Sequence, residues 1–331
     1  MGAAMALDMI PPPHARPFLT ANGWGDAEIL PLAGDASFRR YFRVVDGTRR
    51  AVLMDAPPPQ EDPRPFLAVA NWLTDHGFGA PAIYASDDDR GLVLLEDFGD
   101  NRMREAIDRD PAATEGLYQN AVDVLIALRG CPAGDWRPYD RAELHREAAL
   151  LVEWYCPALG LDVDLAGYTA AWDAVFDHAI FARPVTVLRD YHVENLMLVG
   201  DPHRLGLLDF QDALAGHPAY DLVSLLQDAR RDVAPELENA MIERYCNVTG
   251  EGEAFMRAYH VLGAQRNAKI IGIFTRLWKR DGKPRYPGLC PRVWTYLERD
   301  LAQPALAPVA AWFDANIPAS LRGDPLQLSA R

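Results

Sequence analysis

The chain has 331 residues, of which 49% are hydrophobic and 24% charged, and 33 Lys and Arg against 47 Asp and Glu give a net charge of −14. This length suits two lobes or domains rather than one small core. The acidic balance argues against a nucleic acid or an anionic membrane as partner, because both attract basic patches. The four cysteines form no C-x-x-C pair, so we expect buried apolar thiols of a reducing compartment rather than a zinc or redox motif.

The first residues predict no targeting segment. The stretch 1–13 has no Lys or Arg before its short apolar run, which argues against a signal peptide or a membrane span. Ala6 stands where N-myristoylation wants Ser or Thr. We therefore expect a cytoplasmic monomer with a small-molecule substrate and with neither nucleic acid nor membrane as partner.

The first hundred residues predict antiparallel strands with one inserted helix. Pro31 cannot donate to a strand ladder, so the strand that contains it is expected at a sheet edge. Asp46-Gly47 is a two-residue hairpin signal between two apolar runs. The predicted elements are strands at 29–32, 38–45, 50–54, 82–85 and 92–96, and a helix near 63–76.

Beyond residue 100 the apolar spacing becomes helical. Two short apolar runs, 185–188 and 205–208, interrupt this pattern, and acidic residues follow each of them closely. The pattern predicts a small β-rich N-terminal lobe, residues 1–99, and a larger helical C-terminal lobe, residues 100–331. The predicted helices lie near 112–129, 140–155 and 165–182, from 220 onward, and at 251–279, 291–302 and 305–315.

Two acidic motifs follow the short apolar runs. Asp190 comes directly after Arg189, and Asn195 follows five positions later; Asp209 ends the second run. Phosphoryl transfer needs one carboxylate that orients the attacking hydroxyl and takes its proton, together with oxygen ligands for Mg²⁺ beside the ATP phosphates. Each residue alone is commonly a turn or a helix cap, but the ordered set predicts a kinase site.

Three segments carry a family resemblance: 188–195, 208–212 and 218–222. They resemble the aminoglycoside phosphotransferase/choline kinase family, and the likeness runs from about residue 32 to 313. The implied fold is α+β, a protein-kinase-like two-lobed fold that binds ATP and Mg²⁺. The segments 34–43, 54–58 and 265–274 resemble a narrower group, the anomeric kinases of N-acetylmuramate and N-acetylglucosamine used in cell-wall recycling.

The resemblance implies roles for four acidic or amide side chains. Asp190 would be the catalytic base, and Asn195 and Asp209 would be the magnesium ligands. Asp221 would brace the catalytic loop from a helix start, a role compatible with a plain N-cap.

The resemblance also implies an ATP-binding part in the N-terminal lobe. The turn that contains Gly34 and Ser37 would cover the phosphates, although it could be a simple hairpin turn. Glu96 and Asp97 would mark the hinge whose backbone meets adenine.

The sequence departs from the family pattern at two positions. Leu188 stands where a histidine usually precedes the catalytic aspartate, so we expect a repacked loop. Met54 stands where the third strand should carry a lysine. Arg39 or Arg40 could neutralise the phosphates instead, since a guanidinium suits bidentate phosphate contact, or both could be solvated strand residues.

Five side chains are candidates for contact with the acceptor. His192, Glu194 and Asp212 could bind sugar hydroxyls, although a bracing or solvated role is as reasonable for each. Arg266 and Lys269 share a helical face by spacing and could meet the lactyl carboxylate of muramate, or could simply be exposed.

Three functions compete on the sequence alone. The first is a sugar 1-kinase that acts on N-acetylmuramate or N-acetylglucosamine. The second is another small-molecule kinase of the family, with an aminoglycoside, choline or homoserine as acceptor. The third is a nucleotide-binding pseudokinase, which only the missing lysine supports. A protein kinase is disfavoured, because no recognisable activation segment separates Asp209 from Pro218.

Overall fold

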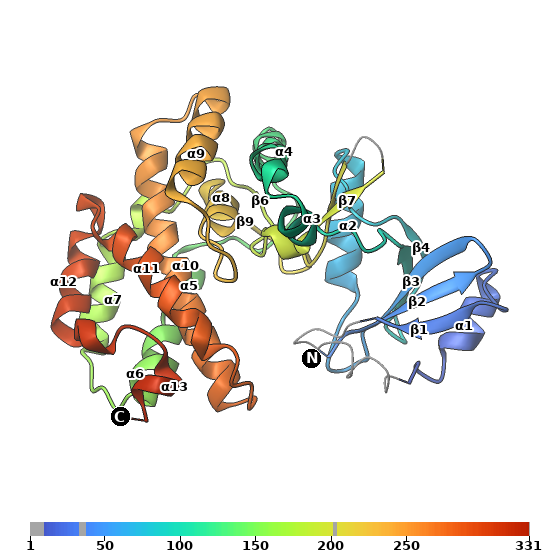
Figure 1. Cartoon of the computed structure of the whole chain (residues 1–331), viewed down its shortest axis with the longest axis horizontal. Helices are drawn as coiled ribbons and strands as arrows, with labels where there is room; N and C mark the ends of the chain where they lie inside the picture. Colours follow the sequence, from blue (N-terminus) through green and yellow to red (C-terminus); the bar gives the residue numbers. More distant parts are fainter. Residues whose placement is uncertain (1–9, 33–37, 201–203, 331) are drawn as a thin grey trace. The chain divides into compact units, whose positions relative to one another are not determined.

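A computed structural model describes residues 10–32, 38–200 and 204–330. The chain forms two compact units (Figure 1). Unit 1 contains residues 1–113 and 193–212, and unit 2 contains residues 114–192 and 213–331. The chain therefore leaves unit 2 directly after His192 and returns to it at Ala213. The lobe boundary expected between residues 99 and 100 stays a prediction.

Unit 1 is built on a five-stranded antiparallel sheet in the order β1-β2-β3-β5-β4. Pro31 lies on β1, at the sheet edge where the sequence placed it. Gly47, in the β2–β3 turn, has a φ of 58°, which glycine adopts without strain. The strands are β1 (Glu28–Pro31), β2 (Arg40–Asp46), β3 (Arg49–Asp55), β4 (Ile83–Asp87) and β5 (Leu92–Glu96).

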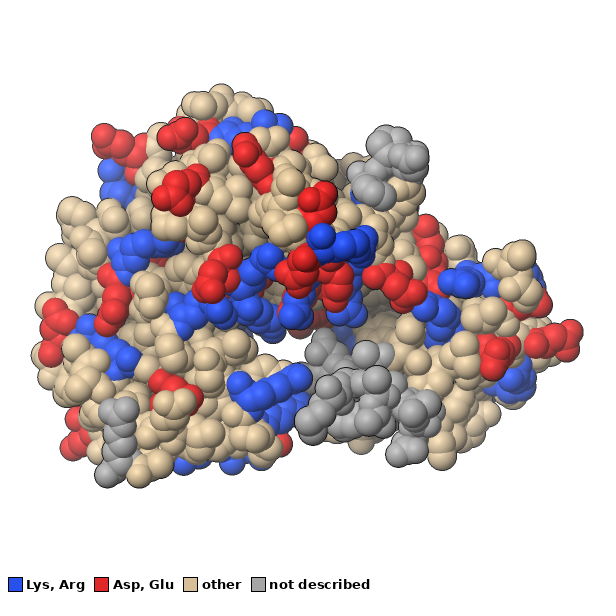
Figure 2. Space-filling view, in the orientation of Figure 1, with Lys and Arg blue, Asp and Glu red and all other residues tan. Residues whose placement is uncertain are grey.

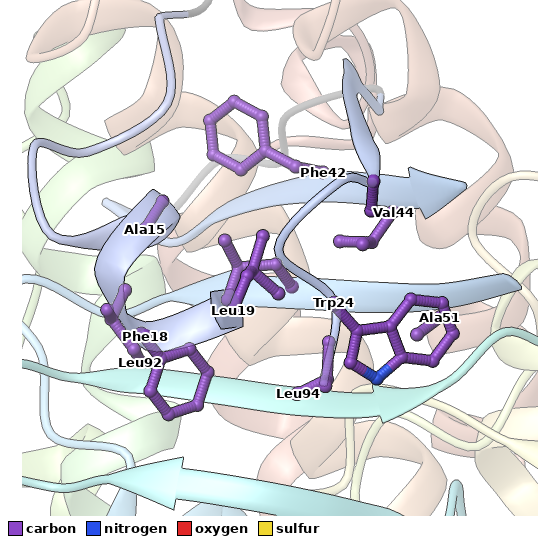
Figure 3. Packing of buried hydrophobic residues seen from close by; sticks show 11 residues of the cluster. Ala15, Phe18, Leu19, Trp24, Phe42, Val44, Ala51, Leu92 and Leu94 are labelled. Carbon is purple, nitrogen blue, oxygen red and sulfur yellow. The ribbon is translucent and has the colours of Figure 1, made fainter. Parts of the chain in front are cut away.

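The core of this sheet includes a helix that the sequence analysis missed. Phe18 and Leu19 of α1 (Ala15–Ala21), together with Trp24, pack against strand residues such as Phe42 and Leu94 (Figure 3). Fully burying such a side chain contributes roughly 1.5–3 kcal/mol. The predicted helix near 63–76 is α2 (Arg64–Asp75).

A second small sheet in unit 1 positions one of the acidic motifs. β7 (Leu196–Val199) pairs with β8 (Arg204–Leu207), with Leu196 opposite Leu207. Residues 195 and 208 therefore face each other at one end of the pair, and the Leu208 N–H donates to the Asn195 carbonyl over 3.0 Å. The helix α3 (Met103–Arg109) packs beside β7.

Unit 2 is helical and centres on α10 (Glu253–Lys279), a helix of 27 residues. A Cβ on Gly272 would lie 2.3 Å from the Leu150 carbonyl, so only glycine allows this close approach. The chain that α10 meets there continues as a π-helical turn, Leu151–Tyr155. Besides α10, the larger helices are α4 (Thr114–Arg129), α5 (Arg141–Ala148), α7 (Leu165–Asp173), α8 (Ala219–Leu226), α9 (Pro235–Thr249), α11 (Cys290–Leu301) and α12 (Ala307–Asn316).

Three sequence expectations need correction. The helix expected over 165–182 ends at Asp173, and a short 3-10 turn, Phe176–His178, follows it. The helical stretch expected from residue 220 onward is interrupted, because α8 ends at Leu226 and α9 begins at Pro235. Cys156 and Cys290 are buried as expected, but Cys131 and Cys246 are partly exposed. Within the described residues, no helix is both long and apolar enough to span a membrane.

Candidate active site

The buried side chain of Asp221 holds the loop that carries Asp190. This loop follows β6 (Val185–Val187), which pairs with β9 (Leu214–Gly216). Asp221, in the first turn of α8, accepts hydrogen bonds from the backbone N–H groups of Leu188 at 2.7 Å and Arg189 at 2.8 Å. Burial outweighs these two bonds and raises the pKa of Asp221 to about 7. The loop backbone is thereby fixed immediately before the predicted base.

Both acidic loops contain a strained residue. Among the residues that the structure describes, Arg189 and Asp209 are the non-glycine residues with positive φ, at 71° and 59°. Such a conformation costs about 1–3 kcal/mol and persists only where the surroundings enforce it. The strain lies at the two loops to which the sequence assigns chemistry.

Arg189 is bound through its side chain and its carbonyl. Its guanidinium pairs with the buried Glu147 of α5, which also accepts from Lys269 Nζ at 2.7 Å. Its carbonyl accepts from Ser224 Oγ at 3.0 Å, and Ser224 Oγ accepts in turn from Arg266 Nη2 at 2.8 Å. Helices α5 and α8 therefore bind the residue that precedes Asp190, and α10 supports both of these contacts through Lys269 and Arg266.

Asp190 is exposed to solvent and surrounded by positive charge. Desolvation by neighbouring atoms acts to raise the pKa of its carboxyl group, but the charges of Lys269, Arg266 and Arg189 help to outweigh it, so the pKa is lowered. The carboxylate is therefore ionised at neutral pH, which is the state that a proton acceptor requires.

Asn195 and Asp209 meet at the end of the β7–β8 pair. The Asn195 side-chain amide donates to Asp209 Oδ2 at 3.4 Å, and Gln211 donates to Asp209 Oδ1 at 2.8 Å. Phe210, fully buried, stacks on Phe66 of α2 with ring centroids 5.1 Å apart. This stacking anchors the chain next to the Asp209 carboxylate.

The donor set of this pair fits Mg²⁺. The side-chain carbonyl of Asn195 and the carboxylate of Asp209 bring two kinds of hard oxygen donor to the same end of this strand pair. Mg²⁺ is usually held by one or two carboxylates or carbonyls together with water and substrate phosphates.

The candidate acceptor contacts fall in different places. His192 is buried in unit 2, with its Nε2 3.3 Å from Nη1 of Arg230. Burial lowers the pKa of His192, and the charge of Arg230 adds to this effect. Glu194 lies in unit 1, where its carboxylate pairs with Arg104 at 2.7 Å, and Asp212 is exposed at the end of unit 1.

Arg266 and Lys269 point into the interior of unit 2. Their exposed fractions are 3% and 9%. Besides the pair with Glu147, Lys269 donates to the Tyr220 hydroxyl at 3.2 Å, while Arg266 binds Ser224. The bonds described show Arg266 and Lys269 supporting the loop of Asp190 through Ser224 and Glu147. Direct contact of these two side chains with an acceptor stays a prediction.

The phosphate-binding candidates of unit 1 hold acidic partners. Met54 is fully buried on β3. Opposite its neighbour Asp55 in the sheet register lies Arg40, whose Nε donates to the Asp55 carboxylate at 2.8 Å. Arg39 binds Glu61 at 3.1 Å. The turn residues Gly34 and Ser37 lie outside the described residues.

The predicted hinge follows β5. The Glu96 carboxylate accepts from the Ala82 N–H at 3.2 Å. Asp97 accepts from the Gly99 N–H at 2.8 Å and pairs with Arg43 of β2 at 2.7 Å. These bonds fix the side chains, and the backbone contact with adenine stays a prediction.

Sequence reasoning missed Arg230 and Asp228. Asp228 is 1% exposed and accepts from the Arg230 N–H at 2.8 Å, which fixes the chain between α8 and α9. The run Asp228-Ala229-Arg230-Arg231-Asp232 was a visible signal, because a dense charge cluster directly follows an apolar helix.

Residues 28–259 match the phosphotransferase enzyme family. Two relatives are N-acetylmuramate/N-acetylglucosamine kinases. The protein from Pseudomonas aeruginosa is 43% identical over 87% of this chain and 89% of its own. The protein from Caulobacter vibrioides is 38% identical over 92% of this chain and 96% of its own.

Solved structures share the fold at low identity. A choline/ethanolamine kinase family protein from Mesorhizobium loti has a TM-score of 0.61 and 15% identity, covering 93% of this chain and 98% of its own. An aminoglycoside phosphotransferase in complex with streptomycin and ATP has a TM-score of 0.57 and 14% identity, covering 90% and 98%. With the antiparallel sheet and the helical remainder, these similarities confirm the α+β kinase-like fold.

Proposed function

Because the chain belongs to the phosphotransferase enzyme family, we propose that it is a sugar 1-kinase that transfers the γ-phosphoryl group of ATP to the anomeric hydroxyl of N-acetylmuramate or N-acetylglucosamine. The family match confirms the resemblance drawn from the motifs and identifies the protein as an ATP-dependent kinase. The choice of sugar follows the two relatives at 38% and 43% identity. The sugar 1-phosphate product would serve the recycling of cell-wall fragments.

The observation that carries the proposal is the exposed, ionised Asp190 on a rigidly held loop. In the proposed reaction its carboxylate accepts a hydrogen bond from the anomeric hydroxyl. The anomeric oxygen forms a bond to the γ-phosphorus, the bond to the β-phosphate oxygen breaks, and the hydroxyl proton passes to Asp190. The anomeric hydroxyl is the most acidic on a reducing sugar, so a carboxylate with a low pKa can act as the base.

The charge of ATP has two proposed partners in unit 1. Asn195 and Asp209 would hold Mg²⁺, which supplies charge neutralisation at the phosphates when bound. Arg39 or Arg40 would neutralise the ATP phosphates in place of the third-strand lysine, whose position Met54 occupies. Arg40 is already oriented by Asp55 on the neighbouring strand, so the guanidinium would not need to be ordered when ATP binds.

The decisive experiment compares N-acetylglucosamine with its 1-O-methyl glycoside, which keeps the ring substituents but lacks the free acceptor. We expect ATP-dependent phosphorylation of the free sugar and of N-acetylmuramate, none of the glycoside, and a C1 phosphate by phosphorus NMR. Equal phosphorylation of both compounds would place the phosphate on another carbon. If neither amino sugar reacts while choline, homoserine or an aminoglycoside does, the acceptor belongs to another class.

A further inference from the structure

Four cationic side chains surround Asp190 and His192. Lys269, Arg266 and Arg189 contribute to the pKa of Asp190, and Arg230 contributes to the pKa of His192. The first three are turned into unit 2, where Glu147, Ser224 and Tyr220 accept their hydrogen bonds or ion pairs. Arg230 differs from them because it is exposed.

The position of Arg230 is fixed at both ends. Its N–H is held by the buried carboxylate of Asp228 at 2.8 Å. Its guanidinium reaches the His192 ring, with Nη1 3.3 Å from Nε2. His192 follows Asp190 by two positions, so the exposed charge of Arg230 lies one side chain away from the loop that carries the base.

An anionic acceptor needs a specific cation on this protein. The net charge is −14, and on the face shown in Figure 2 Lys and Arg side chains lie among Asp and Glu rather than forming a broad basic field. Burial keeps the pKa of His192 low, so its ring adds no charge at neutral pH. A guanidinium binds a carboxylate through two parallel hydrogen bonds, which gives both strength and orientation.

We propose that Arg230 determines acceptor specificity by binding the carboxylate of an acidic sugar, the lactyl carboxylate in N-acetylmuramate. This inference rests on the proposed sugar kinase function and refines it. It moves the carboxylate-binding role from Arg266 and Lys269, which are bound beneath the loop, to the exposed arginine beside His192. Neutral N-acetylglucosamine has no carboxylate and gains nothing from this contact.

The test measures kcat/KM for both sugars in the wild type and in Arg230→Gln. We expect the ratio of N-acetylmuramate to N-acetylglucosamine activity to fall at least tenfold, about 1.4 kcal/mol, mainly through KM for N-acetylmuramate. Arg230→Lys should recover part of the ratio, because it restores the charge but not the bidentate geometry. Arg257→Gln is the matched control, since it removes another exposed arginine of unit 2, and it should leave the ratio unchanged.

An unchanged ratio in Arg230→Gln would overturn the inference, whether both activities persist or both fall together. That result leaves the proposed function standing, because the wild type still phosphorylates both sugars. A wild type that phosphorylates neither sugar would overturn the proposed function and the inference with it. Thermal unfolding of each variant separates loss of folding from loss of binding.

Discussion

The loop that contains Arg189 and the loop that contains Asp209 each hold a non-glycine residue at positive φ, but different kinds of side chain bind these two residues. Arg189 and Asp209 both adopt positive φ, yet Arg189 is bound by charged groups and Asp209 by neutral amides. Glu147 neutralises the guanidinium of Arg189, whereas Asn195 and Gln211 donate to Asp209 without cancelling its charge. The Arg189 guanidinium beside the proposed base is therefore neutralised within unit 2, whereas the amide donors to Asp209 in unit 1 carry no charge.

We therefore expect the two units to contribute differently to catalysis. The protein itself supplies the structure around Asp190, so the proposed base should be in place before any ligand binds. Asn195 and Asp209, as proposed metal ligands, should become fully effective only with Mg²⁺ and nucleotide. Substitutions on the two sides should therefore fail in different ways.

The largest expected effect is the loss of turnover in Asp190→Asn and in Asp209→Ala, and nucleotide binding should distinguish the two variants. Asp190→Asn removes the proton acceptor, so turnover should fall by orders of magnitude while Mg·ATP still binds. Asp209→Ala should abolish turnover and also weaken nucleotide binding that depends on Mg²⁺. Steady-state rates and calorimetric titration of ATP with and without Mg²⁺ make the comparison. Near-normal turnover in Asp190→Asn, or unchanged Mg·ATP affinity in Asp209→Ala, would remove the respective assignment.

The next effect concerns stability beneath the catalytic loop. Burial acts to raise the pKa of Glu147, but the charges of Lys269 and Arg189 prevail and lower it from 4.5 to about 2. Ionisation of Glu147 thus stabilises the fold above pH 4.5, and this contribution is lost as the pH falls toward 2. Glu147→Gln should lower the free energy of unfolding by about 3–5 kcal/mol at pH 7. The difference from wild type should shrink at pH 3, as measured by urea unfolding.

The matched control is Glu143→Gln, one turn earlier on α5. Its partner Arg146 has a side chain that is 60% exposed, so the loss should be about 1 kcal/mol or less. Equal losses of unfolding free energy for Glu147→Gln and Glu143→Gln at pH 7 would show that the buried ion pairs of Glu147 stabilise the fold no more than the exposed pair does.

The smallest expected effect concerns the phosphate clamp of unit 1. Replacing Arg39 or Arg40 by Ala should raise the KM for ATP or lower kcat, and at least one variant should change by about tenfold, or 1.4 kcal/mol. Arg49→Ala, an exposed residue on β3 of the same sheet, should behave as wild type. Wild-type kinetics in both single variants and in the double variant would place the clamp elsewhere.

The sequence predicted the features that depend on local chemistry. Pro31 was placed at a sheet edge because it lacks an N–H, and the Asp46-Gly47 turn was found because glycine tolerates its backbone angles. The order of Asp190, Asn195 and Asp209 was enough to indicate a kinase, and the family match agrees.

The sequence could not predict features that depend on distant partners. Arg266 and Lys269 looked like an exposed face, and only the fold brings Ser224 and Glu147 to bury them. On helix α9, Glu238 is buried by pairing with Arg299, so its polarity hid an interior position from the apolar spacing. In both cases a charged side chain is inside because its hydrogen-bond or ion-pair partner comes from far along the chain.

The missing side chain at Gly272 has a consequence for how this enzyme can evolve. Gly272 lies one turn beyond Lys269 on α10 and lets that helix approach the backbone at Leu150 and Leu151. Any larger residue would push α10 outward and carry Lys269 away from Glu147. Fewer substitutions should therefore be tolerated at this position than at Arg230, whose side chain is exposed. A lineage could then diversify its acceptor range while inheriting the base unchanged.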